Sequence, residues 1–149
     1  MNTRPGQPLR CRSAGRLQSA GVPEIVTFQR EHAEAIAALC HAEGWDSWDD
    51  VERVASALSA PGVTTLAALD EGRVIGAIEV IGDAGINWTV AMLIVAPSHR
   101  RRGFGKRLIE TAFGATGATR LDLLTEDEGP LFYRRLPGRE MRGFRLYPN

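Results

Sequence analysis

The sequence predicts a mixed α/β domain in which a mostly antiparallel sheet is flanked by helices. Strand-type apolar segments alternate along the chain with segments whose apolar residues recur at helical spacing. Short turns rich in glycine and aspartate join neighbouring strand segments, as β-hairpins require. A length of 149 residues is sufficient for one such domain with a full hydrophobic core.

The composition is that of an ordinary soluble globular protein. Hydrophobic residues make up 44% of the chain and charged residues 24%, and no apolar run approaches the roughly 20 residues needed to cross a bilayer. The formal net charge is zero, which argues against general affinity for nucleic acid. Cys11 and Cys40 have no partners at metal-ligand or redox-motif spacing. We therefore expect no metal site and a cytoplasmic location.

The first 23 residues differ in character from the rest. They hold four arginines, three prolines and three glycines, and they carry no acidic residue. Such a segment buries too little apolar surface to offset the entropy lost on ordering, so we expect a disordered basic tail over 1–23. An arginine-rich start loosely fits an organelle transit peptide, but proline and glycine interrupt any amphipathic helix.

The first half of the domain is expected to be one strand followed by two helices. The strand is expected at 25–28, and the first helix over about 31–44. Ser47 and Asp50 have a capping-box-like spacing that predicts the start of the second helix. The Pro-Gly pair at 61–62 ends it.

The second half is expected to alternate strands with two further helices. The predicted strands are 64–69, 73–81, 86–94, 120–124 and 144–147. A helix is expected from the segment after Gly103, with glycines 114 and 117 marking its end. Pro130 is a good first residue for a short helix through Leu136.

The junction between the long strand and the helix after it is the most informative stretch. Three arginines and two glycines follow Pro97, and the helix then presents one apolar face, formed by Phe104, Leu108, Ile109, Ala112 and Phe113. Free N–H groups and the dipole at a helix N-terminus favour anions, above all phosphates. Gly103 and Gly105 remove side chains that would block a phosphate, and they can adopt positive φ. The spacing is neither that of a P-loop nor that of a Rossmann fingerprint.

The pattern Val95-x-Pro97-x-x-Arg100-x-x-Gly103-x-Gly105 resembles the pyrophosphate loop of the GCN5-related N-acetyltransferases, the GNAT superfamily. The expected order of elements is also that of the GNAT acyl-CoA N-acyltransferase fold, over 24–149. The resemblance implies that acetyl-CoA is the cosubstrate, that loop N–H groups hold its pyrophosphate, and that the preceding strand pairs with its pantetheine arm. The implied cofactor-binding residues are Leu93, Ile94, Val95, Arg100, Arg101, Arg102, Gly103, Phe104, Gly105 and Lys106. A solvated basic patch is the alternative reading of the three arginines.

The resemblance also points to a general acid. Phe132-Tyr133 resembles a Phe-Tyr pair of the family whose tyrosine lies beside the coenzyme sulfur and protonates the departing thiolate. A phenol with a reference pKa of about 10 is protonated at neutral pH, so Tyr133 is the candidate. A tyrosine that only packs is the alternative. Where the family has Leu-Gly-Phe, this chain has Leu-Pro-Gly-Arg at 136–139, which affects how the last strand docks.

Most of the other notable polar and aromatic residues fit either a functional or a purely structural role. Glu79 lies among apolar residues that would raise its pKa, which suits a general base, but it also fits a solvent-facing position in a half-buried strand. The acidic loop 126–128 would attract a cationic amine or simply be solvated. Trp45 and Trp48 would stack on the acceptor or cap the core, and His99 is expected to be solvated.

The resulting hypothesis is an N-acetyltransferase that moves an acetyl group from acetyl-CoA directly to a primary amine of a small molecule or a peptide. A non-catalytic acyl-CoA-binding sensor or regulatory module is the alternative, because no base stands out. Neither nucleic acid nor a membrane is expected as a partner, and a homodimer is compatible with the sequence.

Overall fold

The computed structural model describes residues 23–83, 85–126 and 129–148. In this part of the chain one five-stranded sheet has the order β1-β2-β3-β4-β5. The strands are β1 Glu24–Thr27, β2 Val63–Asp70, β3 Arg73–Gly82, β4 Trp88–Val95 and β5 Asp122–Leu123. The first four pair antiparallel, and β5 pairs parallel to β4. The predicted mixed fold is confirmed.

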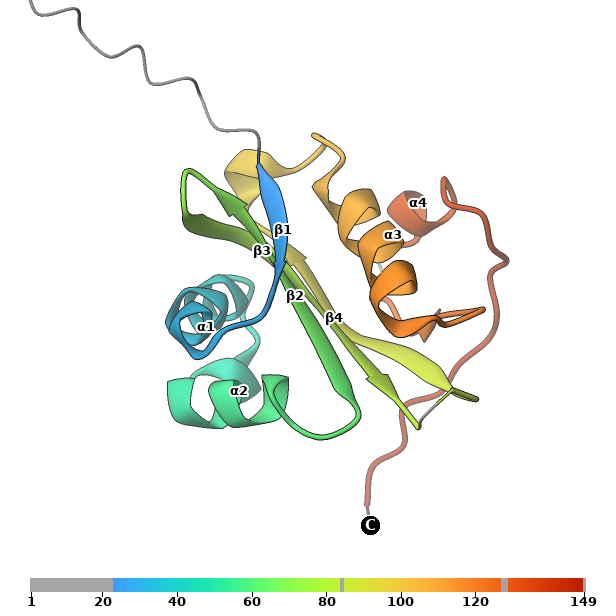
Figure 1. The fold of residues 1–149 in the computed structure, drawn as a ribbon. Helices are drawn as coiled ribbons and strands as arrows, with labels where there is room; N and C mark the ends of the chain where they lie inside the picture. Colours follow the sequence, from blue (N-terminus) through green and yellow to red (C-terminus); the bar gives the residue numbers. More distant parts are fainter. Residues whose placement is uncertain (1–22, 84, 127–128, 149) are drawn as a thin grey trace, which may run out of the picture.

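Helices cover both faces of the sheet (Figure 1). They are α1 Ala33–Ala42, α2 Val51–Leu58, α3 Phe104–Thr116 and α4 Pro130–Tyr133. Helices α1 and α2 lie on one face, and α3 and α4 lie on the other. The sheet therefore separates two apolar layers, as expected when side chains alternate along each strand.

Each layer is built by the periodicity of its helix. Under α1 and α2 the buried cluster is Phe28, Ala33, Ile36, Ala37, Cys40, Val54, Ala55, Leu58, Ala77, Met92 and Ile94. Under α3 the cluster is Leu66, Ala68, Ile75, Ile78, Val80, Val90, Phe104, Leu108, Ile109 and Ala112. The helical members recur at three- and four-residue intervals, which places them on one side of each helix.

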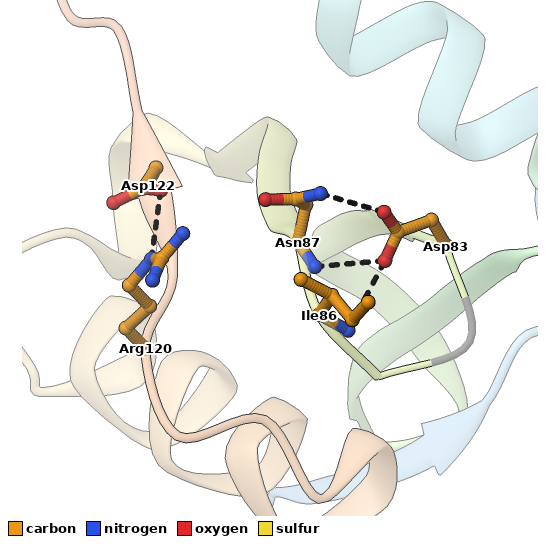
Figure 2. A network of polar contacts seen from close by, with 5 residues as sticks. All are labelled: Asp83, Ile86, Asn87, Arg120 and Asp122. Atoms are coloured by element: carbon orange, nitrogen blue, oxygen red, sulfur yellow. Dashed lines mark hydrogen bonds and ion pairs between the residues drawn. The ribbon is translucent and has the colours of Figure 1, made fainter.

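The turn between β3 and β4 is closed by one aspartate (Figure 2). The Asp83 carboxylate accepts hydrogen bonds from the backbone N–H groups of Ile86 and Asn87 at 3.1 and 2.7 Å. The Asn87 side-chain amide donates a third at 2.6 Å. These bonds, the Asn87 backbone first, lower the pKa of Asp83. On the other side of this view, Arg120 and Asp122 form an ion pair at the start of β5.

The predicted last strand over 144–147 does not form. Phe144, Leu146 and Tyr147 are 84%, 87% and 77% exposed. The physical reason is the shortness of β5: it covers two residues instead of the predicted 120–124, so it offers almost no edge to pair with. The end of the chain instead passes beside Leu124 without pairing as a strand. A Cβ atom added at Gly143 would lie only 2.4 Å from the Leu124 Cδ2 atom.

Smaller predictions about helix ends also need correction. The cap of α2 is Asp50, whose carboxylate accepts from the Arg53 N–H at 3.0 Å, whereas Ser47 lies in a preceding 3₁₀ turn. Phe113 is 36% exposed because it lies at the margin of the buried face of α3. Ile86 belongs to the turn before β4 and is 77% exposed.

The predicted basic tail lies almost wholly outside the described residues, which begin at Pro23. Along the described part of the chain, no helix has the length and apolar character that crossing a membrane requires.

Candidate active site

Strands β4 and β5 separate after a short common stretch. The two pair only at Thr89 with Asp122 and at Val90 with Leu123, and β5 ends there. Strand β4 continues to Val95 and stays paired with β3 on its other side. A register shift in that pairing leaves Ala91 as an extra residue, a β-bulge at the point where the sheet opens. Beyond Val90, one edge of β4 has no strand partner among the described residues.

The backbone groups that face this open edge follow from the pairing. The Ala96 N–H donates to the Ile75 carbonyl oxygen on β3 at 2.8 Å. Because backbone groups alternate sides along an antiparallel strand, Ile94 also faces β3, whereas Leu93 and Val95 face the open edge. Of the three predicted strand residues, Leu93 and Val95 thus present main-chain groups to the opening. The Ile94 side chain is buried in the core.

The loop after β4 presents a run of unpaired N–H groups. A 3₁₀ turn, η3 Pro97–His99, leads into it, and Arg101 and Gly103 have positive φ values of 60° and 83°. Among the described residues, the backbone N–H groups from Arg101 to Lys106 have no hydrogen-bond partner, and α3 has no side-chain cap. The first bond of the helix runs from the Arg107 N–H to the Gly103 carbonyl at 3.0 Å. Together these groups form a helix N-terminus suited to an anion.

The cationic side chains of the loop have different surroundings. The Arg100 guanidinium donates from Nε to the Val95 carbonyl oxygen at 2.9 Å and also pairs with Glu43. Arg101 is exposed. The Arg102 guanidinium lies 5.7 Å from the centroid of the Phe104 ring, a cation–π contact. Arg100 therefore ties the loop to the end of α1.

The two glycines differ from what the sequence suggested. Gly103 has positive φ, as predicted, and precedes α3 as its N-cap. Gly105 lies within the first turn of α3 and does not have positive φ. An ideal Cβ at Gly105 would lie 3.0 Å from the Phe132 ring, so this glycine lets α4 approach α3 closely.

His99 is not solvated, contrary to expectation. Its side chain is 15% exposed, and its Nε2 atom lies 3.0 Å from the Asp70 carboxylate at the end of β2. Its Nδ1 atom lies 2.8 Å from the Ser98 hydroxyl, and its ring meets Phe104 edge to face with centroids 6.0 Å apart. No local pattern indicates this contact, because Asp70 is 29 residues away in the chain.

Tyr133 packs on the α3 side of the sheet. It is half-buried against the cluster under α3, which Leu93 and Val95 also contact. Its ring meets that of Phe132 edge to face at 4.9 Å between centroids. Burial raises the pKa of Tyr133 above its ordinary value, so the phenol is protonated at neutral pH.

Glu79 is buried, so the solvent-facing reading is wrong. It is 5% exposed, and burial raises the pKa of its carboxyl group. Glu79 pairs with Met92 in the sheet and faces α1. There, burial first and then the charges of Glu43 and Glu79 raise the pKa of the Cys40 thiol to about 12.

The Glu79 carboxylate keeps a path to solvent. No hydrogen bond to this carboxylate is present among the described residues. None of their side-chain oxygen or nitrogen atoms, however, is both fully buried and without a hydrogen bond, so the Glu79 oxygens must be accessible to solvent. Glu79 lies on the α1 face and Tyr133 on the α3 face, so these two candidates do not share one face of the sheet.

The remaining candidates are peripheral to the opening. Trp45 and Trp48 are half-buried and pack against the cluster under α1 and α2, which supports the core-capping reading. Glu126 is exposed and lies 3.8 Å from Arg145, while residues 127 and 128 are outside the described part. The described residues hold no group of three or more histidine, cysteine, aspartate or glutamate side chains placed to bind a metal.

Comparison with known proteins agrees with this geometry. The family model of the acetyltransferase (GNAT) domain matches residues 61–136, about half of the chain. The chain belongs to the GNAT acetyltransferase family. The matched region runs from the turn before β2 to the end of the α4 region, and so contains both the open edge and the loop. No curated protein matches the chain.

Solved structures share the fold over most of its length. A GNAT family protein of Streptococcus pneumoniae TIGR4 is 29% identical, with a TM-score of 0.69 over 86% of this chain and 98% of the other. A ribosomal-protein-alanine N-acetyltransferase of Brucella melitensis biovar Abortus 2308 is 16% identical, with a TM-score of 0.71 over 87% and 100%. AAC(6')-Iy, in complex with the bisubstrate analogue CoA-S-monomethyl-acetylneamine, is 21% identical, with a TM-score of 0.66 over 87% and 99%.

Proposed function

We propose that the protein transfers an acetyl group from acetyl-CoA directly to the primary amine of a small molecule or a peptide. The observation that carries this proposal is the continuity of two main-chain surfaces, a strand edge without a strand partner and a run of unpaired amides. The open edge of β4 ends at Val95, and six unpaired N–H groups follow from Arg101 to Lys106. The first surface suits the amide-bearing pantetheine arm, and the second suits the pyrophosphate.

The donor would be held mainly by the backbone. Leu93 and Val95 would pair with the pantetheine arm, and an N–H group of this edge would polarise the thioester carbonyl. The amides from Arg101 to Lys106 would hold the pyrophosphate, with the nearby cationic side chains adding charge. The complex of AAC(6')-Iy, which shares this fold, with a bisubstrate CoA analogue supports a CoA-type donor.

The chemistry needs one proton acceptor and one donor. The neutral amine attacks the thioester carbonyl carbon, the carbon–sulfur bond breaks, and the thiolate takes a proton from the Tyr133 hydroxyl. Glu79 would accept the proton that the amine loses, directly or through water. Burial raises the pKa of both groups, which keeps Tyr133 protonated and makes Glu79 a stronger base than an ordinary carboxylate.

Two of the structures that share this fold suggest two different classes of acceptor amine. The Brucella protein is a ribosomal-protein-alanine N-acetyltransferase, and the AAC(6')-Iy ligand joins CoA to an acetylneamine. A screen of peptide N-termini and small polyamines would decide between them.

Calorimetry with acetyl-CoA tests the donor site. The double variant Gly103→Asp plus Gly105→Asp should abolish binding, because it places two carboxylates beside the amides. Gly114→Asp is the matched control: it adds a carboxylate to the same helix, where an added Cβ meets nothing within 4 Å. Failure of the intact protein to bind, or equal binding by the double variant, would refute the proposal.

A sensor or regulatory module that binds acyl-CoA without turnover is the second candidate. The placement of Glu79 and Tyr133 on opposite faces of the sheet favours it. Acetylation of any amine in the screen at a rate above the uncatalysed reaction would exclude it.

A further inference from the structure

We propose that His99, held by Asp70, is a positioning residue for the anion-binding loop, and that this pair sets the affinity of the loop for a pyrophosphate group. The inference rests on the proposed function for the identity of the ligand. It adds a residue that lies before the loop and is not among the residues proposed to bind the coenzyme.

The loop needs an external restraint. Its six unpaired N–H groups make no hydrogen bond to the rest of the described chain. Arg101 has a φ of 60°, a left-handed conformation that is costly for any residue with a side chain. Three adjacent arginines also repel one another. Such a conformation persists only where surrounding contacts hold it in place.

His99 supplies that restraint at the entry to the loop. Its Nε2 atom bonds to Asp70 on the neighbouring hairpin, and its Nδ1 atom bonds to Ser98. Its ring also contacts Phe104, the first residue of α3. One side chain therefore connects the β2–β3 hairpin, the start of the loop and the start of the helix.

Arg100 fixes the same loop from another side. It binds the Val95 carbonyl and Glu43, at the end of α1. Because Arg100 belongs to the proposed cofactor site, it cannot test positioning independently. His99 and Asp70 can, since neither is among the residues proposed to contact the coenzyme.

The chain offers a matched control pair. His41 and Asp49 also form a histidine–aspartate contact, with 2.7 Å between Nδ1 and Oδ1. Their side chains are 71% and 49% exposed, against 15% and 26% for His99 and Asp70. The control pair links α1 to the segment before α2.

The first experiment measures binding of coenzyme A by calorimetry. His99→Ala and Asp70→Ala should each weaken binding by about tenfold or more, and the double variant should be no weaker than either single variant, because the two residues act as one unit. Asp70→Asn keeps a hydrogen-bond acceptor and should recover most of the affinity. His41→Ala should bind like the wild type. Wild-type affinity in His99→Ala, or additive losses in the double variant, would overturn the proposal.

The second experiment separates positioning from a general loss of structure. Turnover is compared for acetyl-CoA and for acetylpantetheine, which lacks the pyrophosphate. His99→Ala should raise KM for acetyl-CoA with little change in kcat, and it should leave kcat/KM for acetylpantetheine unchanged. An equal loss with both donors would show a merely structural role and overturn the proposal. If His99→Ala does not fold, the same comparison with His99→Gln, which also removes the imidazole ring, decides.

Failure of the proposed function would remain distinguishable. Inorganic pyrophosphate is a probe of the loop that requires no coenzyme and no turnover. If the wild type binds pyrophosphate but not coenzyme A, the proposed function fails, and weaker pyrophosphate binding by His99→Ala still supports positioning. If the wild type and His99→Ala bind pyrophosphate equally, positioning fails whatever the donor.

Discussion

Gly103 and Gly105 lie two residues apart and are needed for different reasons. Gly103 has a φ of 83°, and nothing lies within 4 Å of an added Cβ, so only its backbone conformation requires glycine. Gly105 is helical, and glycine is needed there because an added Cβ would lie only 3.0 Å from the Phe132 ring. A motif with two glycines thus combines a backbone turn with a close contact between two helices.

The space around each glycine predicts different outcomes for alanine substitutions at two positions of α3, Gly114 and Gly105. Gly114→Ala should stabilise the protein by about 0.5–1 kcal/mol, because alanine favours the helix and its Cβ meets open space. Gly105→Ala should gain less or lose stability, because Phe132 must move. Urea unfolding of the two variants measures the difference, and a larger gain at Gly105 would contradict the role given to Phe132.

Tyr133 makes a separate prediction at the residue scale. If its hydroxyl protonates the thiolate, Tyr133→Phe should lower kcat by about 10²-fold while coenzyme affinity changes little. Tyr147→Phe is the matched control, because Tyr147 is the other tyrosine of the chain and is 77% exposed. Equal kcat values for Tyr133→Phe and the wild type would remove Tyr133 from the reaction.

At the scale of elements, the separation of β4 from β5 defines the candidate site, and the sequence predicts it only in part. The alternation of apolar residues along 86–94 correctly indicates a strand, because burial imposes a period of two. The point where pairing stops depends on the short β5 and on the bulge at Ala91, and neither leaves a local signal. Contacts such as Asp70 with His99 join residues far apart in the chain and are equally invisible.

The end of the chain shows why strand propensity alone misleads. Residues 144–147 have the apolar and aromatic character of a strand, but a strand also needs an edge to pair with. The basic loop was predictable for the opposite reason: its arginines, glycines and helix start are contiguous, so their geometry is mostly local.

The exposed end of the chain predicts tolerance to truncation. Deletion of residues 139–149 removes four large side chains that are 67–87% exposed. The melting temperature should therefore change by less than about 2 °C. Leu108→Ala, which truncates a fully buried side chain, is the contrasting variant and should cost about 2–5 kcal/mol. A large loss on truncation, measured by thermal unfolding, would show that this segment packs in solution.

At the scale of the whole molecule, Glu79 links stability to pH. The pKa of its carboxyl group is raised in the folded protein, so the unfolded chain loses its proton first as the pH rises. Between the unfolded and folded pKa values the native state binds more protons. The free energy of unfolding therefore falls as the pH rises through this interval.

Glu79→Gln removes this dependence. The variant should gain stability over the wild type as the pH rises from 4.5 to 7, because glutamine does not ionise. Chemical denaturation at the two pH values measures the change, and Glu34→Gln on the exposed side of α1 is the control for losing a carboxylate. A gain that does not grow with pH would contradict the burial of an ionisable Glu79.

The run of amides from Arg101 to Lys106 has a consequence for engineering. A recognition surface made of main chain imposes few demands on side-chain chemistry, since every residue except proline supplies the same N–H group. Libraries that randomise positions 101, 102 and 106 should therefore retain many binders, whereas insertions or deletions there should retain few.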